Sequence, residues 1–321
     1  MDKENNLIKQ LSKIVIFLLI FFIFLNLFSS ILLPKNNNKK SGIKYESARG
    51  FYGERKNSLD IIAVGNSNLY SSFIPNQLWN HTGYTSYVCG EPSQTVFQAY
   101  ALLKEVFSCQ KPQLVILETD GLFTKGDEFE QIVSMHVKEI FPIFEYHSRW
   151  RNIQLNDFTD SPHYNTIINN KGYVYRNAIK PYKGGKKYLR KKKSRDNFNI
   201  FNQIYLDKIN KLCQDNQASL LLLSVPSAKS WNYEKHNKIN DYALKKNINF
   251  LDLNTEKKQA NINWMTDTKD KGMHLNINGA KKVTKYLGKY LQKNYSFVDH
   301  RRDIQYDEWN QNKLQVIENK T

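Results

Sequence analysis

A serine in the first third of the chain has the surroundings of a nucleophile. Ser67 follows the apolar run 61–64 and Gly65, so it stands where a buried strand ends and the next element begins. Backbone N–H groups at such a start favour negative charge, and an oxyanion formed beside Ser67 would face them. The competing interpretation is that Ser67 only caps a helix.

A histidine near the C-terminus could supply the matching base. His274 lies in a loop that enters a helix, and two carboxylates, Asp267 and Asp270, precede it closely. A carboxylate can orient an imidazole, and the oriented imidazole can take a proton from a serine. None of the other six histidines has such a setting in the sequence. The pair Ser67 and His274 therefore indicates acyl-transfer chemistry.

Alternating strands and helices must bring these residues together. The expected strands are 59–64, 84–89, 113–118, 219–225 and 250–253, and the expected helices are 93–108, 199–214, 234–246 and 278–292. This order predicts an α/β fold, a flavodoxin-like three-layer α/β/α sandwich with a central, mostly parallel sheet. Sites in such sheets lie at the carboxyl ends of strands, where Ser67, Gly90 and Glu118 all fall.

The first 57 residues predict a membrane anchor rather than part of the sheet. A short polar tail, 1–13, precedes the apolar stretch 14–33, which is long enough to cross a bilayer as one helix, and a linker follows at 34–57. A cleaved signal peptide is the competing interpretation, but no small-x-small site follows the apolar run. More lysines follow the span than precede it, so the positive-inside rule taken literally would keep the main domain cytoplasmic.

The main domain is expected at 58–296, with an insertion at about 127–198 and a C-terminal tail at 297–321. The net charge of +17 and a basic run at 183–195 indicate an anionic partner, either a wall polymer or lipid head groups. Nucleic acid ranks last, since no recognition helix, RNA-binding signature or zinc motif accompanies the run.

The three cysteines do not form a metal or disulfide pattern. Cys89, Cys109 and Cys213 are an odd number without metal or redox spacing, and they are expected to be free thiols. We expect no cofactor and no metal.

Several sequence blocks together resemble the SGNH (GDSL-like) hydrolase superfamily, most closely its membrane-anchored bacterial members of the Gram-positive cell envelope. The resemblance covers most of residues 55–309, including a tail with Asp299, His300, Arg301, Arg302, Asp303, Tyr306 and Trp309. The blocks are Gly65-Asn66-Ser67 after the first strand, Gly90 after the second, and Asp270 followed by His274-Leu275-Asn276 and Gly279-Ala280.

The resemblance implies Ser67 as nucleophile, His274 as general base and a nearby aspartate as its orienter. It also implies an oxyanion hole built from the backbone N–H groups of Ser67 and Gly90. Asp270 is our choice of orienter and Asp267 the second candidate, because the superfamily's usual position, three residues before the histidine, holds Lys271.

Two further departures concern the first and third blocks. The superfamily's Gly-Asp-Ser is here Gly65-Asn66-Ser67, and its oxyanion-hole asparagine is replaced by Glu118-Thr119-Asp120, which puts a third donor in doubt. Asn68, Gln94 and Glu118 are candidate substrate-binding residues. Gln94 fits equally well as an ordinary residue of a first helical turn.

The resulting hypothesis is a serine esterase or O-acyltransferase acting on acylated cell-envelope glycans or teichoic-acid-like polymers, anchored in the cell membrane with its catalytic domain on the extracellular face. Hydrolase and transferase share the acyl-enzyme, so sequence does not separate them. The alternative is a non-catalytic anchored subunit that binds anionic wall polymer or a membrane acyltransferase. A third hypothesis, nucleic-acid binding through the basic run, predicts salt-sensitive affinity that is independent of Ser67.

Overall fold

The computed structural model describes residues 2–124, 126–255 and 260–311 of the chain. The chain divides into two compact units, one holding residues 1–44 and 129–165 and the other holding 45–128 and 166–321. The insertion expected at 127–198 is thus shared between the two units. The last part of the expected C-terminal tail, 312–321, lies outside the described residues.

The second unit is built on a five-stranded sheet in which all neighbouring strands run parallel. The strands are β1 (Ile61–Gly65), β2 (Ser86–Gly90), β3 (Leu114–Glu118), β4 (Ser219–Ser224) and β5 (Asn249–Asp252). Their order across the sheet is β2-β1-β3-β4-β5, a flavodoxin-like order. The predicted parallel α/β fold is confirmed.

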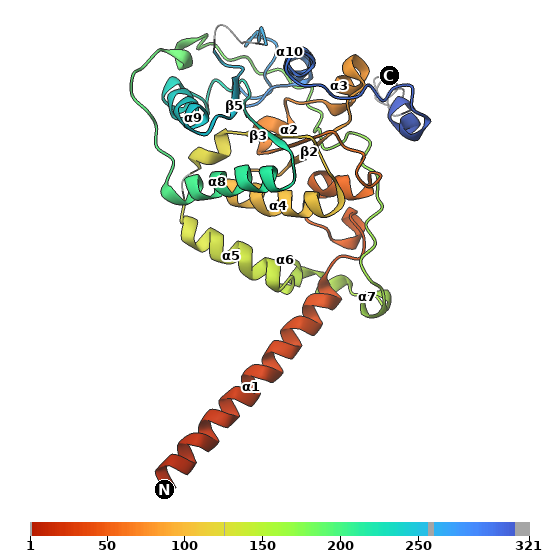
Figure 1. Cartoon of the computed structure of the whole chain (residues 1–321), viewed down its shortest axis with the longest axis vertical. Coiled ribbons are helices and arrows are strands. Elements are labelled where there is room, and N and C mark those ends of the chain that lie inside the picture. The colour runs from red at the N-terminus through yellow and green to blue at the C-terminus, as the bar shows by residue number, and fades with distance from the viewer. Residues whose placement is uncertain (1, 125, 256–259, 312–321) are drawn as a thin grey trace. The chain divides into compact units, whose positions relative to one another are not determined.

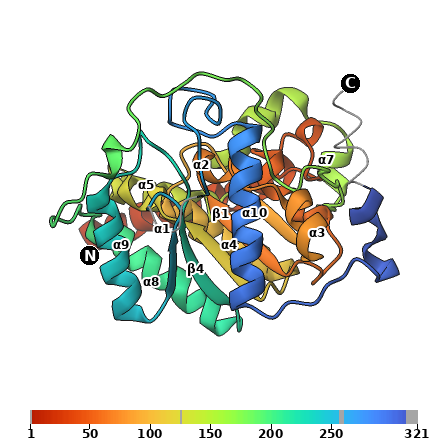
Figure 2. The same ribbon diagram turned by 90° about the horizontal axis from the view of Figure 1, so that it is seen from above.

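Helices cover both faces of this sheet. The helices of the second unit are α2 (Ser67–Tyr70), α3 (Pro75–Thr82), α4 (Val96–Cys109), α8 (Ile200–Asp215), α9 (Tyr233–Lys246) and α10 (Ile277–Asn294). α3 and α10 pack together on one face, and α4 and α8 pack together on the other (Figures 1 and 2). Because both faces are covered, β1, β2 and β3 are buried along their whole length.

Most element ends lie within about two residues of the expected ones, and the largest shift has a local cause. The helix expected from residue 93 begins at Val96, because Thr95 and Gln98 form a reciprocal capping box. Ser93 has a left-handed backbone with φ of 53°, which excludes it from the helix.

The C-terminal segment folds back onto the second unit. Tyr306, in a short 3₁₀ turn (Ile304–Tyr306), and Trp309 are buried, and the Trp309 ring lies 5.4 Å from that of Trp79. Other 3₁₀ turns of this unit are Glu46–Gly53, Asp120–Phe123 and Lys187–Leu189. The turn Glu46–Gly53 lies in the stretch expected as a linker.

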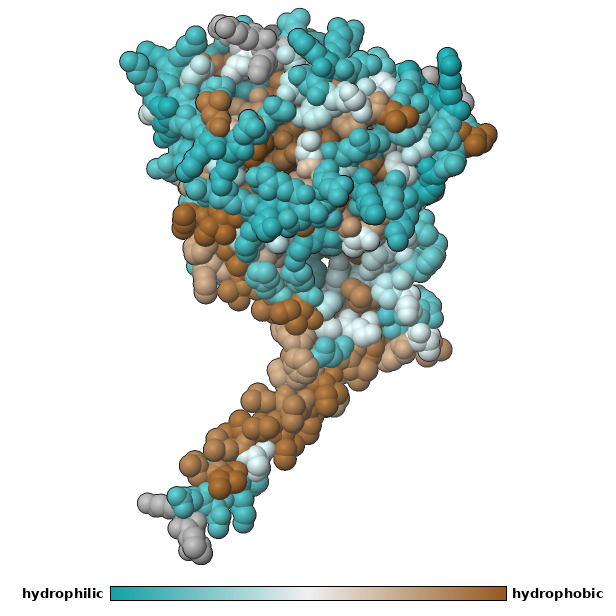
Figure 3. All heavy atoms as spheres, viewed as in Figure 1, coloured by the Kyte–Doolittle hydropathy of each residue, from teal (hydrophilic) through white to brown (hydrophobic). Residues whose placement is uncertain are grey.

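The first unit consists of a long apolar helix and several short helices near its C-terminal end. These are α1 (Asp2–Leu32), a 3₁₀ turn (Lys39–Ser41), α5 (Glu128–Ile140), α6 (Ile143–Tyr146), a 3₁₀ turn (His147–Asn152) and α7 (Asn156–Thr159). Hydrophobic atoms cover most of α1 (Figure 3). Its part Glu4–Leu32 is long and apolar enough to cross a membrane, a property that signal sequences share.

Candidate active site

Ser67 is presented at the carboxyl end of β1 by a sharp exit from the strand. Gly65 approaches β3 so closely that a Cβ added to it would lie 2.5 Å from the Cβ of Glu118. Asn66 then caps the one-turn helix α2, its side chain accepting a hydrogen bond from the Asn68 backbone at 2.9 Å. Ser67 is therefore the first helical residue after the strand.

His274 is held by a tight loop that precedes α10. A bridge between Thr268 and Leu275 closes the loop, and the Thr268 hydroxyl donates to the His274 carbonyl at 2.9 Å. The turn itself is made by Lys271 and Gly272, which both have positive φ, of 61° and 94°. This geometry returns the chain so that His274 lies beside Asp270.

The structure joins three of the predicted side chains by hydrogen bonds. His274 Nε2 lies 2.8 Å from Ser67 Oγ, and His274 Nδ1 lies 2.6 Å from Asp270 Oδ2. The other oxygen of Asp270 accepts the His274 backbone N–H at 2.7 Å. A serine, an imidazole and a carboxylate thus lie in the order that proton transfer from the serine requires.

The environment of Asp270 favours its charged form. Burial is the largest single influence and raises the pKa of Asp270, but hydrogen bonds from His274 and Lys269 outweigh it together and hold the pKa below its usual value. The Lys269 ammonium lies 3.0 Å from Asp270 Oδ2. A carboxylate that stays ionised can orient the imidazole and stabilise its positive charge.

Asp267, the second candidate for that role, lies elsewhere in the loop. Its carboxylate accepts the Asn263 backbone N–H at 2.7 Å and pairs with Lys282 at 2.6 Å, and it is almost fully buried. It fastens the loop to α10.

Gly90 lies at the end of β2, in register with Gly65. A Cβ added to Gly90 would lie 2.9 Å from the ring of Tyr70 on α2, so only glycine fits there without displacement. The Gly90 backbone therefore runs close to the short helix that carries Ser67.

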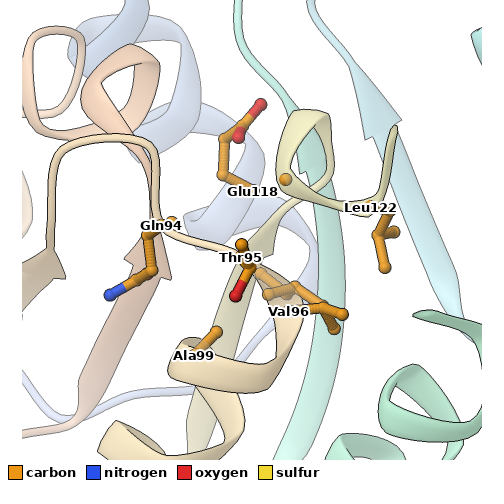
Figure 4. Close-up of a pocket in the computed structure, with 9 residues that line it drawn as sticks. Gln94, Thr95, Val96, Ala99, Glu118 and Leu122 are labelled. Carbon is orange, nitrogen blue, oxygen red and sulfur yellow. The ribbon is translucent and has the colours of Figure 1, made fainter. Parts of the chain in front are cut away.

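All three candidate substrate-binding side chains are buried, and two of them lie around a small cavity (Figure 4). Gln94 and Glu118 both line it, and Figure 4 shows the Glu118 carboxyl group directed away from Val96 and Ala99. Burial, with the charge of Asp120, raises the pKa of Glu118 well above its usual value. In the described part of the chain, one carboxyl oxygen of Glu118 and the Gln94 carbonyl oxygen have no hydrogen-bond partner.

The third candidate, Asn68, begins a hydrogen-bond chain that sequence reasoning missed. Its amide donates to Ser230 at 3.0 Å, the Ser230 hydroxyl bonds Ser227 at 2.7 Å, and Ser227 donates to the carbonyl of Met273 at 2.7 Å. This series of hydrogen bonds ends at Met273, next to His274, and so connects the helix of Ser67 to the loop of His274. Ser227 and Ser230 follow the carboxyl end of β4, which is the one signal that could have found them.

Asp120 is a third missed residue of this network, after Ser227 and Ser230. Its carboxylate accepts from the Asn68 amide at 3.2 Å and pairs with Lys235 at 2.9 Å. It follows the carboxyl end of β3 directly, so the same positional rule applies to it.

Tyr70 lies one helical turn after Ser67 and is another residue that sequence reasoning missed. Burial raises the pKa of Tyr70, while the charge of Arg176 and a hydrogen bond with the Ser67 side chain act in the opposite direction. The i+3 spacing from Ser67 was the available signal. Arg176 is exposed, so this side of the site carries a cation that faces solvent.

The basic run begins directly beside the His274 loop. The Lys180 backbone N–H donates to the carbonyl of Thr268 in this loop at 3.0 Å, and the Lys180 carbonyl accepts the backbone N–H of Lys271 at 2.9 Å. The Tyr182 side chain packs against Gly272. All basic residues of 183–195 are exposed. Lys192 pairs with Glu234, and Arg195 pairs with Asp241.

No protein-family model and no curated protein matches the sequence. Solved structures to which the chain is similar include several described as GDSL-type lipolytic proteins or lipases and others described as acylhydrolases. One, assigned to the G-D-S-L family of lipolytic proteins, from Desulfitobacterium hafniense DCB-2, is 14% identical over 72% of this chain and 98% of its own, with a TM-score of 0.39.

Two further structures have comparable scores. A lipase/acylhydrolase from Enterococcus faecalis is 9% identical over 74% of this chain and 98% of its own, with a TM-score of 0.40. A GDSL-like lipase from Bacteroides thetaiotaomicron VPI-5482 is 14% identical over 73% and 87%, with a TM-score of 0.36. At these identities and TM-scores the similarity says nothing about activity, so a functional assignment depends on the geometry of Ser67, His274 and Asp270.

Proposed function

We propose that this chain is a serine esterase or O-acyltransferase that works through an acyl-serine intermediate. Ser67 would be the nucleophile, His274 the general base and Asp270 the orienter of the imidazole. The observation that carries the proposal is the pair of hydrogen bonds at His274, 2.8 Å to Ser67 Oγ and 2.6 Å to Asp270 Oδ2. A serine more than about 5 Å from its base would have lacked this support.

In the first half of the proposed reaction, Ser67 Oγ attacks an ester carbonyl while His274 Nε2 takes its proton. The negative charge that forms on the carbonyl oxygen would be stabilised by the backbone N–H groups of Ser67 and Gly90. The ester C–O bond then breaks, the leaving oxygen takes the proton from His274, and the acyl group remains on Ser67.

In the second half, an incoming hydroxyl group resolves the acyl-enzyme. The hydroxyl gives its proton to His274 as its oxygen attacks the acyl carbon, and Ser67 recovers a proton when it leaves. Water as the nucleophile makes the protein an esterase, and a sugar or polyol hydroxyl makes it an acyltransferase.

The charges near the site support an acylated, anionic cell-envelope glycan or teichoic-acid-like polymer as substrate. The exposed basic run starts beside the His274 loop, and Arg176 lies beside Tyr70. Such a distribution raises the local concentration of a polyanion near Ser67, and its effect weakens with added salt.

The apolar helix α1 supports a membrane location for this chemistry. We propose that α1 crosses the cell membrane once and that the catalytic unit lies on the extracellular face, where such polymers occur. The lysines at 35, 39, 40 and 44 argue for the opposite orientation, although long domains can be translocated regardless of flanking charge.

The test is labelling of the full chain in detergent with a fluorophosphonate, which reacts covalently with an activated serine. We expect labelling of the wild type and its loss in Ser67→Ala and in His274→Ala. A folded wild type that takes up no label would contradict the proposal and favour the non-catalytic subunit.

A second histidine–carboxylate pair provides a matched control. His236 Nδ1 lies 2.7 Å from Asp252 Oδ2, in an arrangement like that of His274 and Asp270, but no serine among the described residues is bonded to its ring. His236→Gln should keep the labelling of wild type. Equal loss in His236→Gln and His274→Ala would show that the assay reports folding rather than an activated serine.

A further inference from the structure

The part of the first unit that packs against the C-terminal part of α1 carries many apolar side chains that no described residue covers. This segment, residues 129–165, is called the juxtamembrane segment below. Its exposed apolar side chains are those of Phe129, Val133, Ile140, Phe144, Trp150, Ile153, Leu155 and Phe158. Leu155 is 90% exposed and Phe129 66%, so this is a surface rather than a core.

The juxtamembrane segment is fixed to the C-terminal end of α1. Arg149 donates to the carbonyl of Leu32 at 2.7 Å, and the Ile143 backbone donates to the Ser29 hydroxyl at 3.3 Å. Arg149 also pairs with Asp157 at 2.8 Å, which joins α7 to the same point. The segment that carries the apolar surface is therefore attached at the end of the apolar helix.

One contact shows how far along α1 the segment reaches. The rings of Phe141 and Phe22 lie edge to face with centroids 5.7 Å apart. Phe22 lies ten residues before Leu32, or about 15 Å along the helix axis. The hydrocarbon core of a bilayer is about 30 Å thick, so a span that ends with α1 at Leu32 places Phe22, and the Phe141 ring against it, among the acyl chains and deeper than the interface.

We propose that the juxtamembrane segment enters the membrane beside α1, with its polar groups in the interface and its exposed apolar side chains among the lipid acyl chains, which Phe141 reaches beside Phe22. The inference concerns the anchor and not the chemistry of Ser67, and it requires that α1 cross the membrane. Its occupant is the lipid bilayer itself, because the apolar surface is continuous with α1 and reaches the depth of Phe22.

The polar groups of the segment fit the head-group layer. Trp150 is exposed and has the guanidinium of Arg151 5.5 Å from its ring, and tryptophan and arginine are both common at membrane interfaces. Lys39 and Lys40 are not in the segment but lie in the turn that follows α1 in the same unit, and both are exposed. These cations match anionic lipid head groups.

The consequence is a firmer attachment of the catalytic unit. The chain passes between the two units at 44–45, 128–129 and 165–166, so two of the three connections start from the juxtamembrane segment rather than from α1. A segment held in the membrane would anchor the two connections that start from it, in addition to the one that follows α1.

The test is depth-dependent quenching in the full chain, reconstituted in vesicles of phosphatidylcholine and phosphatidylglycerol whose acyl chains carry bromine. Single cysteines labelled with bimane are placed at Phe144 and Leu155, in a Cys109→Ser background in which the other two cysteines are buried. Leu244, 73% exposed on α9 of the second unit, is the matched control, and Leu18 on α1 reports the span.

We expect brominated lipid to lower the bimane signal at positions 18, 144 and 155 about twofold or more, and to leave position 244 unchanged, since interfacial side chains lie about 5–10 Å into the acyl boundary. Quenching at 18 but not at 144 and 155 would overturn the proposal, and would leave another membrane protein as the cover of this surface. No quenching at 18 would also overturn it, by removing the span on which it depends. Neither result bears on fluorophosphonate labelling of Ser67.

Discussion

The carboxyl group of Glu118 is strongly affected by its burial in the interior of the second unit. Burial raises the pKa of Glu118 well above 4.5, its usual value, so the folded chain keeps a proton that the unfolded chain releases. Stability from this proton is complete below the ordinary glutamate pKa and is lost as pH rises toward the raised pKa. Within that window the free energy of unfolding falls by about 1.4 kcal/mol per pH unit.

Glu118→Gln should remove this pH dependence, because glutamine resembles the protonated acid and keeps the carbonyl oxygen that accepts the Asp120 backbone N–H. We expect wild type and variant to be similar at pH 5 and the variant to be the more stable at pH 8. Unfolding of the detergent-solubilised chain across this range measures the difference. Parallel pH curves would mean that Glu118 is ionised in the folded protein.

The two aspartates before His274 should differ in what their removal affects. Asp270→Asn removes the charge beside the imidazole, and we expect the rate of fluorophosphonate labelling to fall by about two to four orders of magnitude. Asp267→Asn should instead lower stability, since Asp267 pairs with Lys282, and leave the labelling rate of the folded protein within about threefold of wild type. Reversed effects would identify Asp267 as the orienter.

At the scale of elements, Asn276 connects the His274 loop to α10. Its side-chain oxygen caps α10 by accepting from Asn278 and Gly279, and its amide donates to the carbonyls of Ala178 and Thr266. Asn276→Ala should cost about 2–4 kcal/mol, the sum of a lost cap and two lost hydrogen bonds in a buried site.

The aspartate variant separates the two roles of this residue. Asn276→Asp keeps an N-cap acceptor but cannot donate to Ala178 and Thr266, so its stability should lie between those of Asn276→Ala and wild type. Thermal unfolding of the three proteins gives the order. An aspartate variant as stable as wild type would assign the whole effect to the cap.

Local pattern explains why the elements could be predicted and their side-chain contacts could not. Apolar runs and helical periodicity marked all five strands and the covering helices α4, α8, α9 and α10, because burial on one or both faces leaves a period in the sequence, whereas α3 was not predicted. The series of hydrogen bonds through Asn68, Ser230, Ser227 and Met273 leaves no such period, since it joins residues far apart in the chain. Asp270 reaches His274 because of the backbone geometry of the turn at Gly272, and this geometry likewise leaves no period in the sequence.

The same limit applied to the insertion. Its aromatic residues were visible in the sequence, but their contact with α1 depends on pairs such as Phe22 and Phe141, which are 119 positions apart (141 − 22). Amphipathic periodicity indicates that a helix has an apolar face and does not say what covers it.

At the scale of the whole molecule, Lys171 and Glu54 form a buried ion pair that joins segments distant in sequence. The Lys171 ammonium lies 2.7 Å from the Glu54 carboxylate with both side chains fully buried, and it also lies 4.5 Å from the centre of the Trp309 ring near the C-terminus. Burial raises the pKa of Glu54, and the charge of Lys171 opposes that rise. The lysine therefore offsets the cost of the buried carboxylate.

Lys171→Met should destabilise the chain by about 3–5 kcal/mol at neutral pH, because it leaves the Glu54 carboxylate buried without a partner. The loss should shrink as pH is lowered toward 5, since a folded-state pKa raised above the unfolded value makes the folded chain bind a proton first. The double variant Glu54→Gln, Lys171→Met should recover much of the stability at pH 7 and lack this pH dependence. Unfolding of the wild type and the three variants, including Glu54→Gln alone, measures the coupling. Additive single effects would mean that the pair contributes nothing beyond its separate side chains, and that the packing around Trp309 holds these segments together.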